Sequence, residues 1–272
     1  MTVPTSERPA VLTIAGFDPS SGAGVTADLK VFAAHGLYGL AAITALTVQS
    51  TQGVRRFHAI NPEFLAETLE CLAEDVEISG VKIGMLGTEG IVRVVAEFLA
   101  GSGIPRSHIV LDPIMRSSSG RTLLDSQGSG LLRRELLPLA GWVTPNLDEL
   151  AEMVGCEVSW RESVPLAARE LASDHHGLNI AVTGGHLDPP DDFLLTADGA
   201  ECWFPGEKIE TRATHGTGCG FSSALLTQLV AGSQPAEAIA RAKQYVRAAM
   251  AAAYPVGKGR GPLNHLYRLD EL

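Results

Sequence analysis

The sequence THGTGCGF, residues 214–221, is a glycine-rich loop that runs directly into a helical pattern. An apolar stripe with helical spacing follows it, formed by Phe221, Leu225, Leu226, Leu229 and Val230. The start of a helix leaves backbone N–H groups unpaired and carries partial positive charge. Because glycine lets a ligand approach this backbone closely, the stretch predicts an anion-binding loop at a helix N-terminus.

Cys219 lies inside this loop. A thiol at a helix N-terminus is expected to have a lowered pKa and to be partly thiolate near neutral pH. A base beside an anion hole suits a kinase, which takes a proton from an alcohol and holds the transferring phosphoryl group. An ordinary helix start with a buried cysteine explains the same residues, and short glycine motifs are often accidental. The choice between these interpretations depends on the remainder of the chain.

The composition indicates a globular α/β protein. A chain of 272 residues with 45% apolar residues can bury a large core, and we expect a single domain spanning 1–272. The net charge of −10 argues against nucleic acid or an anionic membrane as a partner. The first nine residues lack a signal peptide, and the longest apolar run, 40–48, is too short to cross a bilayer. We therefore expect a soluble, cytoplasmic protein.

The four cysteines show no CxxC spacing and no metal-binding pattern, so free thiols in an intracellular protein are the simplest interpretation. They are Cys71, Cys156, Cys202 and Cys219.

Strand-like and helix-like segments alternate along the chain, which is typical of a mostly parallel sheet with helices on both faces. The predicted strands are 11–15, 40–48, 54–60, 81–86, 109–111, 142–144, 180–182, 193–196 and 202–204. The predicted helices are about 24–35, 64–72, 91–98, 131–139, 147–154, 163–173, the segment after the 214–221 loop, and about 235–253.

Polar or glycine residues follow most of the predicted strands. They are Gly16, Gln49, Asp112, Asn146 and the run Thr183-Gly184-Gly185-His186, and Met85 lies at the same edge, near the end of 81–86. In an open parallel sheet, ligands bind in the crevice at the carboxyl ends of the strands. The number of such signals at this one edge favours a binding site, to which the Cys219 loop would also belong.

Asn146 and Glu149 allow two interpretations. An Asn at the N-cap with a Glu three residues later is close to a capping box, which is purely local structure. The same side chains, together with Asp112, could gather around a hydrated Mg²⁺ on nucleotide phosphates, because Mg²⁺ prefers a few oxygen ligands and keeps its waters. Both can hold at once.

Gln49 and Asp28 are further candidates. A primary amide offers a donor and an acceptor side by side, which matches an amino group next to a ring nitrogen. A Gln at a strand end is nevertheless most often simply solvated. Asp28 could interact with the dipole of the helix after Gly24 or accept a hydrogen bond from a ligand. We assign no chemical role to His215 or His265.

Taken together, these residues resemble the hydroxymethylpyrimidine/phosphomethylpyrimidine kinases of thiamine biosynthesis, which belong to the ribokinase-like superfamily. The matching segments include LTIAGFDPSSGAGVTADLKVFAAHGLYG (12–39), ITALTVQSTQGV (43–54), VKIGML (81–86), VLDPIM (110–115), TPNLDELAEM (144–153), GGH (184–186), THGTGC (214–219) and VGKGRGPLNH (256–265). Most ribokinase-like kinases have Asp where this chain has Cys219, whereas the cysteine resembles the thiamine branch and a related group of pyridoxal kinases.

The resemblance implies ATP-dependent phosphorylation of 4-amino-5-hydroxymethyl-2-methylpyrimidine to its monophosphate and then its diphosphate, with Mg²⁺, in a homodimer. It makes Cys219 the base, within the anion hole of Gly216, Thr217 and Gly218. It pairs Gln49 with the aminopyrimidine edge and lines the pyrimidine pocket with Gly16, Asp28, Met85 and Ile114. It assigns Mg-ATP to Asp112, Asn146, Glu149, Thr183 and Gly185, with the first three at the metal.

The chain departs from the family pattern at three positions. Many relatives have Lys at the positions of Thr183 and Ser118, and Thr is usual where Gly220 follows the cysteine. Three rival functions stay open. The first is a pyridoxal kinase, whose substrate lacks the amino group beside a ring nitrogen that Gln49 would pair with. The second is a kinase-like protein that has lost catalysis and only binds a vitamin. The third is a cysteine hydrolase with His215 as its base.

Overall fold

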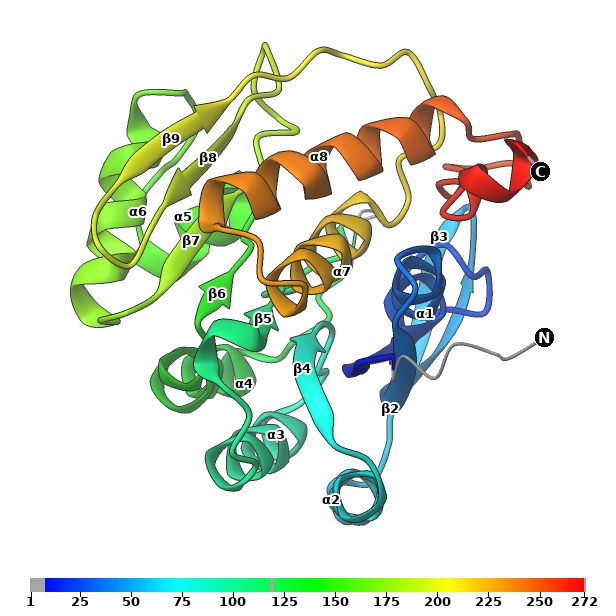
Figure 1. Cartoon of the computed structure of the whole chain (residues 1–272), viewed down its shortest axis with the longest axis vertical. Helices are drawn as coiled ribbons and strands as arrows, with labels where there is room; N and C mark the ends of the chain where they lie inside the picture. The colour runs from blue at the N-terminus through cyan, green and yellow to red at the C-terminus, as the bar shows by residue number, and fades with distance from the viewer. Residues whose placement is uncertain (1–7, 118–119, 272) are drawn as a thin grey trace, which may run out of the picture.

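The computed structural model describes residues 8–117 and 120–271. These residues form a nine-stranded sheet in the order β3-β2-β1-β4-β5-β6-β7-β8-β9 (Figure 1). The strands are β1 (Ala10–Phe17), β2 (Tyr38–Ser50), β3 (Gly53–Ala59), β4 (Ile78–Ile83), β5 (Ile109–Leu111), β6 (Trp142–Val143), β7 (Asn179–Val182), β8 (Asp192–Leu195) and β9 (Glu201–Phe204).

The sheet is parallel in its centre and antiparallel at both edges. From β2 through β1, β4, β5 and β6 to β7, every neighbouring pair is parallel. The pairs β2/β3, β7/β8 and β8/β9 are antiparallel. The expected mostly parallel sheet is therefore confirmed, and its parallel strands all end at one edge.

Helices cover both faces of the sheet, as the alternating sequence pattern predicted (Figure 1). One apolar cluster is shared by the sheet and α1, α7 and α8, and a second one by the opposite face and α2 to α6. The helices are α1 (Gly24–Ala34), α2 (Pro62–Asp75), α3 (Glu89–Gly101), α4 (Ser126–Leu131), α5 (Leu147–Val154), α6 (Ser163–Asp174), α7 (Thr217–Val230) and α8 (Pro235–Ala251).

Helix α7 is buried on nearly every side, which the single apolar stripe did not predict. It packs against α1, α8 and the strands β4 and β5, and all its residues from Cys219 to Thr227 are buried. The buried hydroxyls of Ser222 and Ser223 are tolerated because each donates to a carboxylate. The N-terminus of α7 is therefore held firmly against the sheet.

The helix predicted over 131–139 is only partly correct. Helix α4 begins earlier, at Ser126, where the Asp125 side chain accepts a hydrogen bond from the Gly128 N–H and caps it. Residues Leu132–Leu136 then form a π-helical turn and Leu137–Leu139 a 3₁₀ turn. No helix in the described ranges is long and apolar enough to cross a membrane.

Candidate active site

The loop between β1 and α1 is built around the Asp18 carboxylate. Oδ1 accepts hydrogen bonds from the backbone N–H and the hydroxyl of Ser20, and Oδ2 accepts from the N–H groups of Gly22 and Ala23. His215 Nε2 lies 2.8 Å from Oδ2. Burial alone raises the pKa of Asp18, but the hydrogen bonds from His215 and Ser20 bring it below its ordinary value, so the group is ionised.

The N-terminus of α7 meets this loop through close backbone contacts. Gly216 caps the helix with φ +88°, and a Cβ at this position would lie 1.8 Å from the Gly22 carbonyl oxygen. Only glycine fits such an approach. The Cys219 sulfur in turn receives the backbone N–H of Gly24. The two glycine-rich loops, which are far apart in sequence, therefore form one site.

The expected lowering of the Cys219 pKa is wrong for the ligand-free protein. Cys219 is 6% exposed, and burial raises the pKa of its thiol to about 12. Lys82 and the Gly24 N–H lower it, but the carboxylates of Asp28 and Asp112 add to the rise. A helix N-terminus favours a thiolate only where water or cations solvate it, and here desolvation outweighs that effect.

Lys82 is the buried cation of the site, which the sequence pattern did not single out. Its side chain is fully buried, and Nζ lies 3.0 Å from Asp28 Oδ2 and 4.0 Å from Asp112 Oδ2. Burial by itself lowers the pKa of Lys82, but these carboxylates raise it above its ordinary value, so the ammonium stays charged. Ser223 donates to Asp28 and Ser222 to Asp112, which ties the ion pairs to the first turns of α7.

Asp28 therefore does not line a ligand pocket as expected. Its carboxylate is fully buried, with Oδ2 accepting from Thr13 Oγ1 at 2.6 Å and from Lys82, and Oδ1 accepting from Ser223 at 2.8 Å. Every hydrogen bond of the carboxylate goes to the protein interior, so Asp28 supports the site from below.

The predicted metal residues converge at the ends of β5 and β6. Asn146 and Glu149 form the predicted capping box of α5, because Asn146 Oδ1 accepts from the Glu149 N–H and Glu149 Oε2 accepts from the Asn146 N–H. Burial, followed by repulsion from Asp112, raises the pKa of Glu149 to about 8. Burial also raises the pKa of Asp112, to about 6.

Two buried carboxylates that disfavour each other's charge are suited to a divalent cation, which would remove the repulsion. Asn146 is less suited than expected, since its Oδ1 already caps the helix. Among the described residues, no group of three or more His, Cys, Asp or Glu side chains forms a complete metal site. The residues therefore fit a hydrated Mg²⁺ held mainly by Asp112 and Glu149, with water or substrate oxygens completing its shell.

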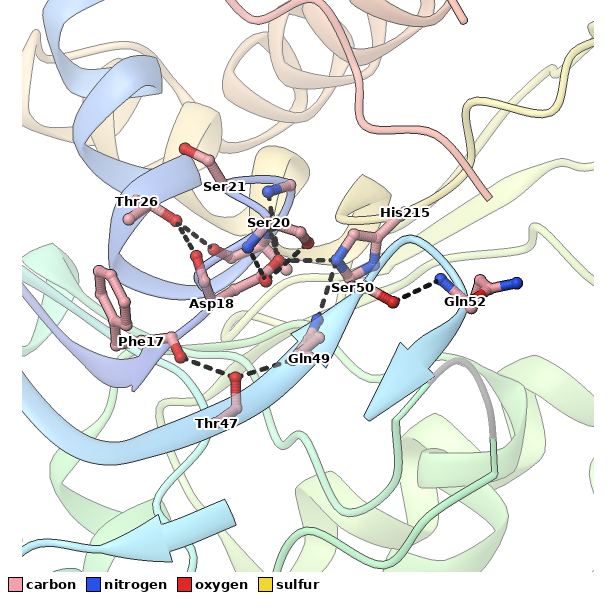
Figure 2. A network of polar contacts seen from close by, with 12 residues as sticks. Phe17, Asp18, Ser20, Ser21, Thr26, Thr47, Gln49, Ser50, Gln52 and His215 are labelled. Carbon is pink, nitrogen blue, oxygen red and sulfur yellow. Dashed lines mark hydrogen bonds and ion pairs between the residues drawn. The ribbon is translucent and has the colours of Figure 1, made fainter. Parts of the chain in front are cut away.

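The remaining pocket candidates form an apolar wall. A Cβ at Gly16 would lie 3.0 Å from Met85 Sδ, and Met85 packs in a small cluster with Ala45, Leu123 and Ile114. Gln49, at the end of β2, points toward His215 with Nε2 at 3.1 Å from the ring Nε2 (Figure 2). The structure thus brings Gly16, Met85 and Ile114 together and places Gln49 beside the Cys219 loop.

The nucleotide candidates Thr183 and Gly185, which follow β7, lie farther along the same edge. Thr183 pairs with Asn146 in a parallel bridge and donates its N–H to Pro145 O, so it stands next to the capping box. Gly185 is exposed, and a Cβ at this position would meet no atom within 4 Å, which leaves room above it. Ser118 lies outside the described residues.

Sequence reasoning missed three residues of this site: Lys82, Asp18 and His215. A single charged residue inside the apolar VKIGML strand was a usable signal for Lys82. Asp18 precedes Pro-Ser-Ser-Gly, a sequence typical of an Asp side chain that caps a turn. Nothing local marks His215, because its partners are 166 and 197 residues away.

Solved structures with the same fold include pyridoxal kinases and a phosphomethylpyrimidine kinase. Bacillus subtilis pyridoxal kinase, solved as an ADP complex, is 29% identical with a TM-score of 0.86, covering 97% of this chain and 100% of its own. Phosphomethylpyrimidine kinase from Clostridium difficile is 32% identical with a TM-score of 0.78, covering 89% and 99%. The fold is therefore ribokinase-like, as expected.

Sequence relatives point to one branch of these kinases. The hydroxymethylpyrimidine/phosphomethylpyrimidine kinase of Haemophilus influenzae is 39% identical over 94% of this chain and 96% of its own. The thiamine biosynthesis bifunctional protein ThiED of Geobacter sulfurreducens is 40% identical over 97% of this chain, which spans about half, 54%, of that longer protein. The family model described as phosphomethylpyrimidine kinase matches residues 18–264. The chain therefore belongs to the phosphomethylpyrimidine kinase family.

Proposed function

We propose that this protein transfers the γ-phosphoryl group of ATP to 4-amino-5-hydroxymethyl-2-methylpyrimidine and then to the resulting monophosphate, in thiamine biosynthesis. The observation that carries the proposal is the single site formed by Cys219 and the start of α7, with Gln49 on one side and Asp112 and Glu149 on the other. Family membership along residues 18–264 supports the same activity.

In the first step, the hydroxymethyl oxygen attacks the γ-phosphorus, the bond from phosphorus to the bridging oxygen breaks, and ADP leaves. Cys219 receives the alcohol proton. It must be a thiolate to do so, and Lys82 and the Gly24 N–H are the groups that favour this form against burial. The backbone N–H groups that open α7, from Gly216 onward, are placed to stabilise the charge on the transferring group.

Mg²⁺ belongs to the proposal as well. Asp112 and Glu149 would hold it, and the ion would neutralise phosphate charge during transfer. ATP would lie along the edge that continues through Asn146 and Thr183 to Gly185, where the parallel strands end.

The second step has a different requirement. A phosphate monoester is already a competent nucleophile, so the transfer to it needs the anion hole more than a base. The two steps should therefore respond differently to changes at Cys219.

A pyridoxal kinase is the second candidate, favoured by the TM-score of 0.86 and 29% identity to the Bacillus subtilis pyridoxal kinase. The experiment that decides is ATP turnover with the aminopyrimidine and with pyridoxal, with the products followed by ³¹P NMR. We expect a higher kcat/KM for the aminopyrimidine and formation of its diphosphate. A preference for pyridoxal would overturn the thiamine assignment. The cytoplasmic homodimer stays a prediction, for which light scattering and cell fractionation are the tests.

A further inference from the structure

We propose that His215 and Thr47 lock the side-chain amide of Gln49 in one orientation and thereby set the direction in which the pyrimidine binds. The inference rests on the proposed function and deepens it, because it concerns how one edge of the substrate is recognised. Figure 2 shows the residues: Asp18 from the first glycine loop, His215 from the Cys219 loop, and Thr47 and Gln49 from β2.

The first constraint comes from the proton between His215 and Asp18. The Asp18 carboxylate already accepts four hydrogen bonds from the loop and is ionised, so it carries no hydrogen. The contact of 2.8 Å to His215 Nε2 therefore requires that Nε2 carries the hydrogen and donates it. A protonated Nε2 has no lone pair with which to accept, so the amide atom of Gln49 that lies 3.1 Å away can only be an acceptor that shares the one Nε2 hydrogen with Asp18. That atom must be the carbonyl oxygen.

The second constraint comes independently from Thr47. Its hydroxyl has one hydrogen and lies 2.9 Å from the Phe17 carbonyl oxygen, which can only accept. Once that hydrogen is donated to Phe17, the hydroxyl oxygen can only accept from the other amide atom of Gln49, 3.2 Å away. That atom must be the NH₂ group.

Both neighbours thus demand the same orientation, with the carbonyl of Gln49 toward His215 and the NH₂ toward Thr47. This is the reverse of the orientation drawn in Figure 2, where Nε2 faces His215 and Oε1 faces Thr47. In the opposite orientation, the NH₂ of Gln49 would donate to His215 and its carbonyl would accept from Thr47. Asp18 would then face a ring nitrogen without a hydrogen, and the Phe17 carbonyl would face a hydroxyl whose hydrogen points to Gln49. The oxygen and nitrogen of an amide are assigned by such partners, since turning the group exchanges two atoms of nearly equal size. The side chains that enforce the choice are largely shielded from solvent, with His215 13% and Asp18 4% exposed.

This orientation has a consequence for the substrate. The amide keeps one acceptor site on its oxygen and one hydrogen on its nitrogen for a ligand. A 4-aminopyrimidine would donate its amino group to the carbonyl on the His215 side and accept at its ring nitrogen on the Thr47 side. The hydroxymethyl group is on the carbon next to the amino-bearing carbon, away from that nitrogen. The alcohol is therefore directed toward the loop of His215, which also contains Cys219. Reversing the amide would direct it away.

The kinetic test uses two matched variants of His215. His215→Gln keeps an N–H near the position of Nε2, and His215→Met has similar length without a donor. The substrates are the aminopyrimidine and the analogue that lacks only the 4-amino group. We expect His215→Met to lower kcat/KM for the aminopyrimidine about tenfold, mainly through KM, the size expected for one hydrogen bond. The analogue should be little affected, and His215→Gln should stay close to the parent.

Repeating the substitution in a Gln49→Met background separates positioning from packing. If His215 acts through Gln49, adding His215→Met to Gln49→Met should not lower kcat/KM for the aminopyrimidine any further. Equal losses for both substrates and in both backgrounds would overturn the proposal and leave His215 a packing residue of its loop. His58→Met is the matched control, because it makes the same change at an exposed histidine of β3.

A measurement on the ligand-free protein keeps this inference separate from the proposed function. In ¹⁵N-labelled protein, the side-chain NH₂ of Gln49, assigned by its loss in Gln49→Met, should show nuclear Overhauser contacts to Thr47 protons. Contacts from this NH₂ to the His215 ring instead would overturn the lock. If the parent prefers pyridoxal to the aminopyrimidine, the proposed function fails, and the NMR result alone decides the orientation of the amide.

Discussion

At the scale of single residues, Lys82 is the main energetic feature of the site. A lysine with no exposed surface is tolerated only when its charge is paired, and Asp28 at 3.0 Å supplies that partner. Asp28 is in turn satisfied by Thr13 and Ser223. Removing the cation alone would leave a buried carboxylate without its counter-charge.

We therefore expect Lys82→Met to lower the free energy of unfolding by about 3–5 kcal/mol, the usual cost of breaking a buried pair. The double variant Lys82→Met/Asp28→Asn should recover much of this loss, because a neutral amide replaces the unpaired charge. Urea unfolding of the parent, both single variants and the double variant measures the coupling. Equal stability of Lys82→Met and the parent would show that the pair does not hold the fold together.

Cys219 provides the second prediction at this scale. Cys219→Ala should lower the rate of alcohol phosphorylation about a hundredfold or more, the scale of a lost general base. The second phosphorylation should fall much less, because its acceptor needs no base. Single-turnover assays with the alcohol and with its monophosphate measure the two steps separately. Cys202→Ala, at an exposed free cysteine, is the control, and full alcohol activity in Cys219→Ala would leave this thiol a packing residue.

At the scale of elements, the start of α5 combines a helix cap with a proposed metal site. Glu149 accepts the Asn146 N–H and is buried beside Asp112, so its carboxylate serves both functions. Glu149→Gln keeps the acceptor oxygen and removes the charge. We expect the Mg²⁺ concentration for half-maximal activity to rise about tenfold or more, the scale of an altered metal environment, with a small change in melting temperature.

The matched control for that experiment is Asp148→Asn, which removes an exposed carboxylate from the same helical turn. It should leave the Mg²⁺ dependence unchanged. A Glu149→Gln protein that melts earlier but has normal Mg²⁺ dependence would reduce Glu149 to its role in the capping box.

Most elements could be predicted because their signals are local. The predicted strand 109–111 and helix 147–154 agree with the structure. An apolar run marks the strand and a capping box marks the helix, and both signals consist of residues close together in the sequence. Helix α4 escaped prediction at its start because Ser126 to Gly130 contains two glycines, which normally disfavour helix. The Asp125 cap and packing against the neighbouring helices override that preference.

The site was predictable only where it coincides with strand ends. Gln49 lies at the end of β2, Asp112 directly follows β5, and Asn146 lies shortly after β6, so the rule for parallel sheets found them. The sign of the Cys219 pKa shift could not be predicted, because it depends on burial and on two carboxylates far away in sequence. Local residues indicate that a helix begins at a thiol, but only the folded structure shows how little water reaches it.

At the scale of the whole molecule, the net charge of the chain is negative, but the binding site contains a region of positive potential. The chain carries a net charge of −10, yet two of its proposed substrates, ATP and the pyrimidine monophosphate, are phosphates. The N-terminus of α7 provides local positive potential at the strand ends, whereas the Lys82 ammonium is offset by Asp28 and Asp112. Binding should therefore depend on these short-range terms and only weakly on long-range attraction.

The C-terminal segment packs against the apolar cluster that contains residues of α7 and α8, and His265 is buried in it. A Cβ at Gly220 of α7 would lie 3.1 Å from the His265 ring, and Tyr245 of α8 stacks on it with ring centroids 6.3 Å apart. Neither ring nitrogen has a hydrogen-bond partner in the described structure. Burial, with a smaller contribution from Lys30, lowers the pKa of His265 to about 4.

This histidine should make the whole protein sensitive to acid. Its pKa rises to about 6.5 on unfolding. Between pH 6.5 and 4, His265 is therefore protonated in the unfolded chain and neutral in the folded protein. Stability from this group is complete above pH 6.5 and is lost as the pH falls toward 4, by up to roughly 3 kcal/mol.

His265→Phe keeps the ring stack and removes the titration. Because Asp112 and Glu149 titrate in both proteins, the quantity to measure is the difference in unfolding free energy between variant and parent across pH 4 to 7. We expect this difference to grow in favour of the variant as the pH falls, and a difference independent of pH would show that His265 is solvated in the folded protein.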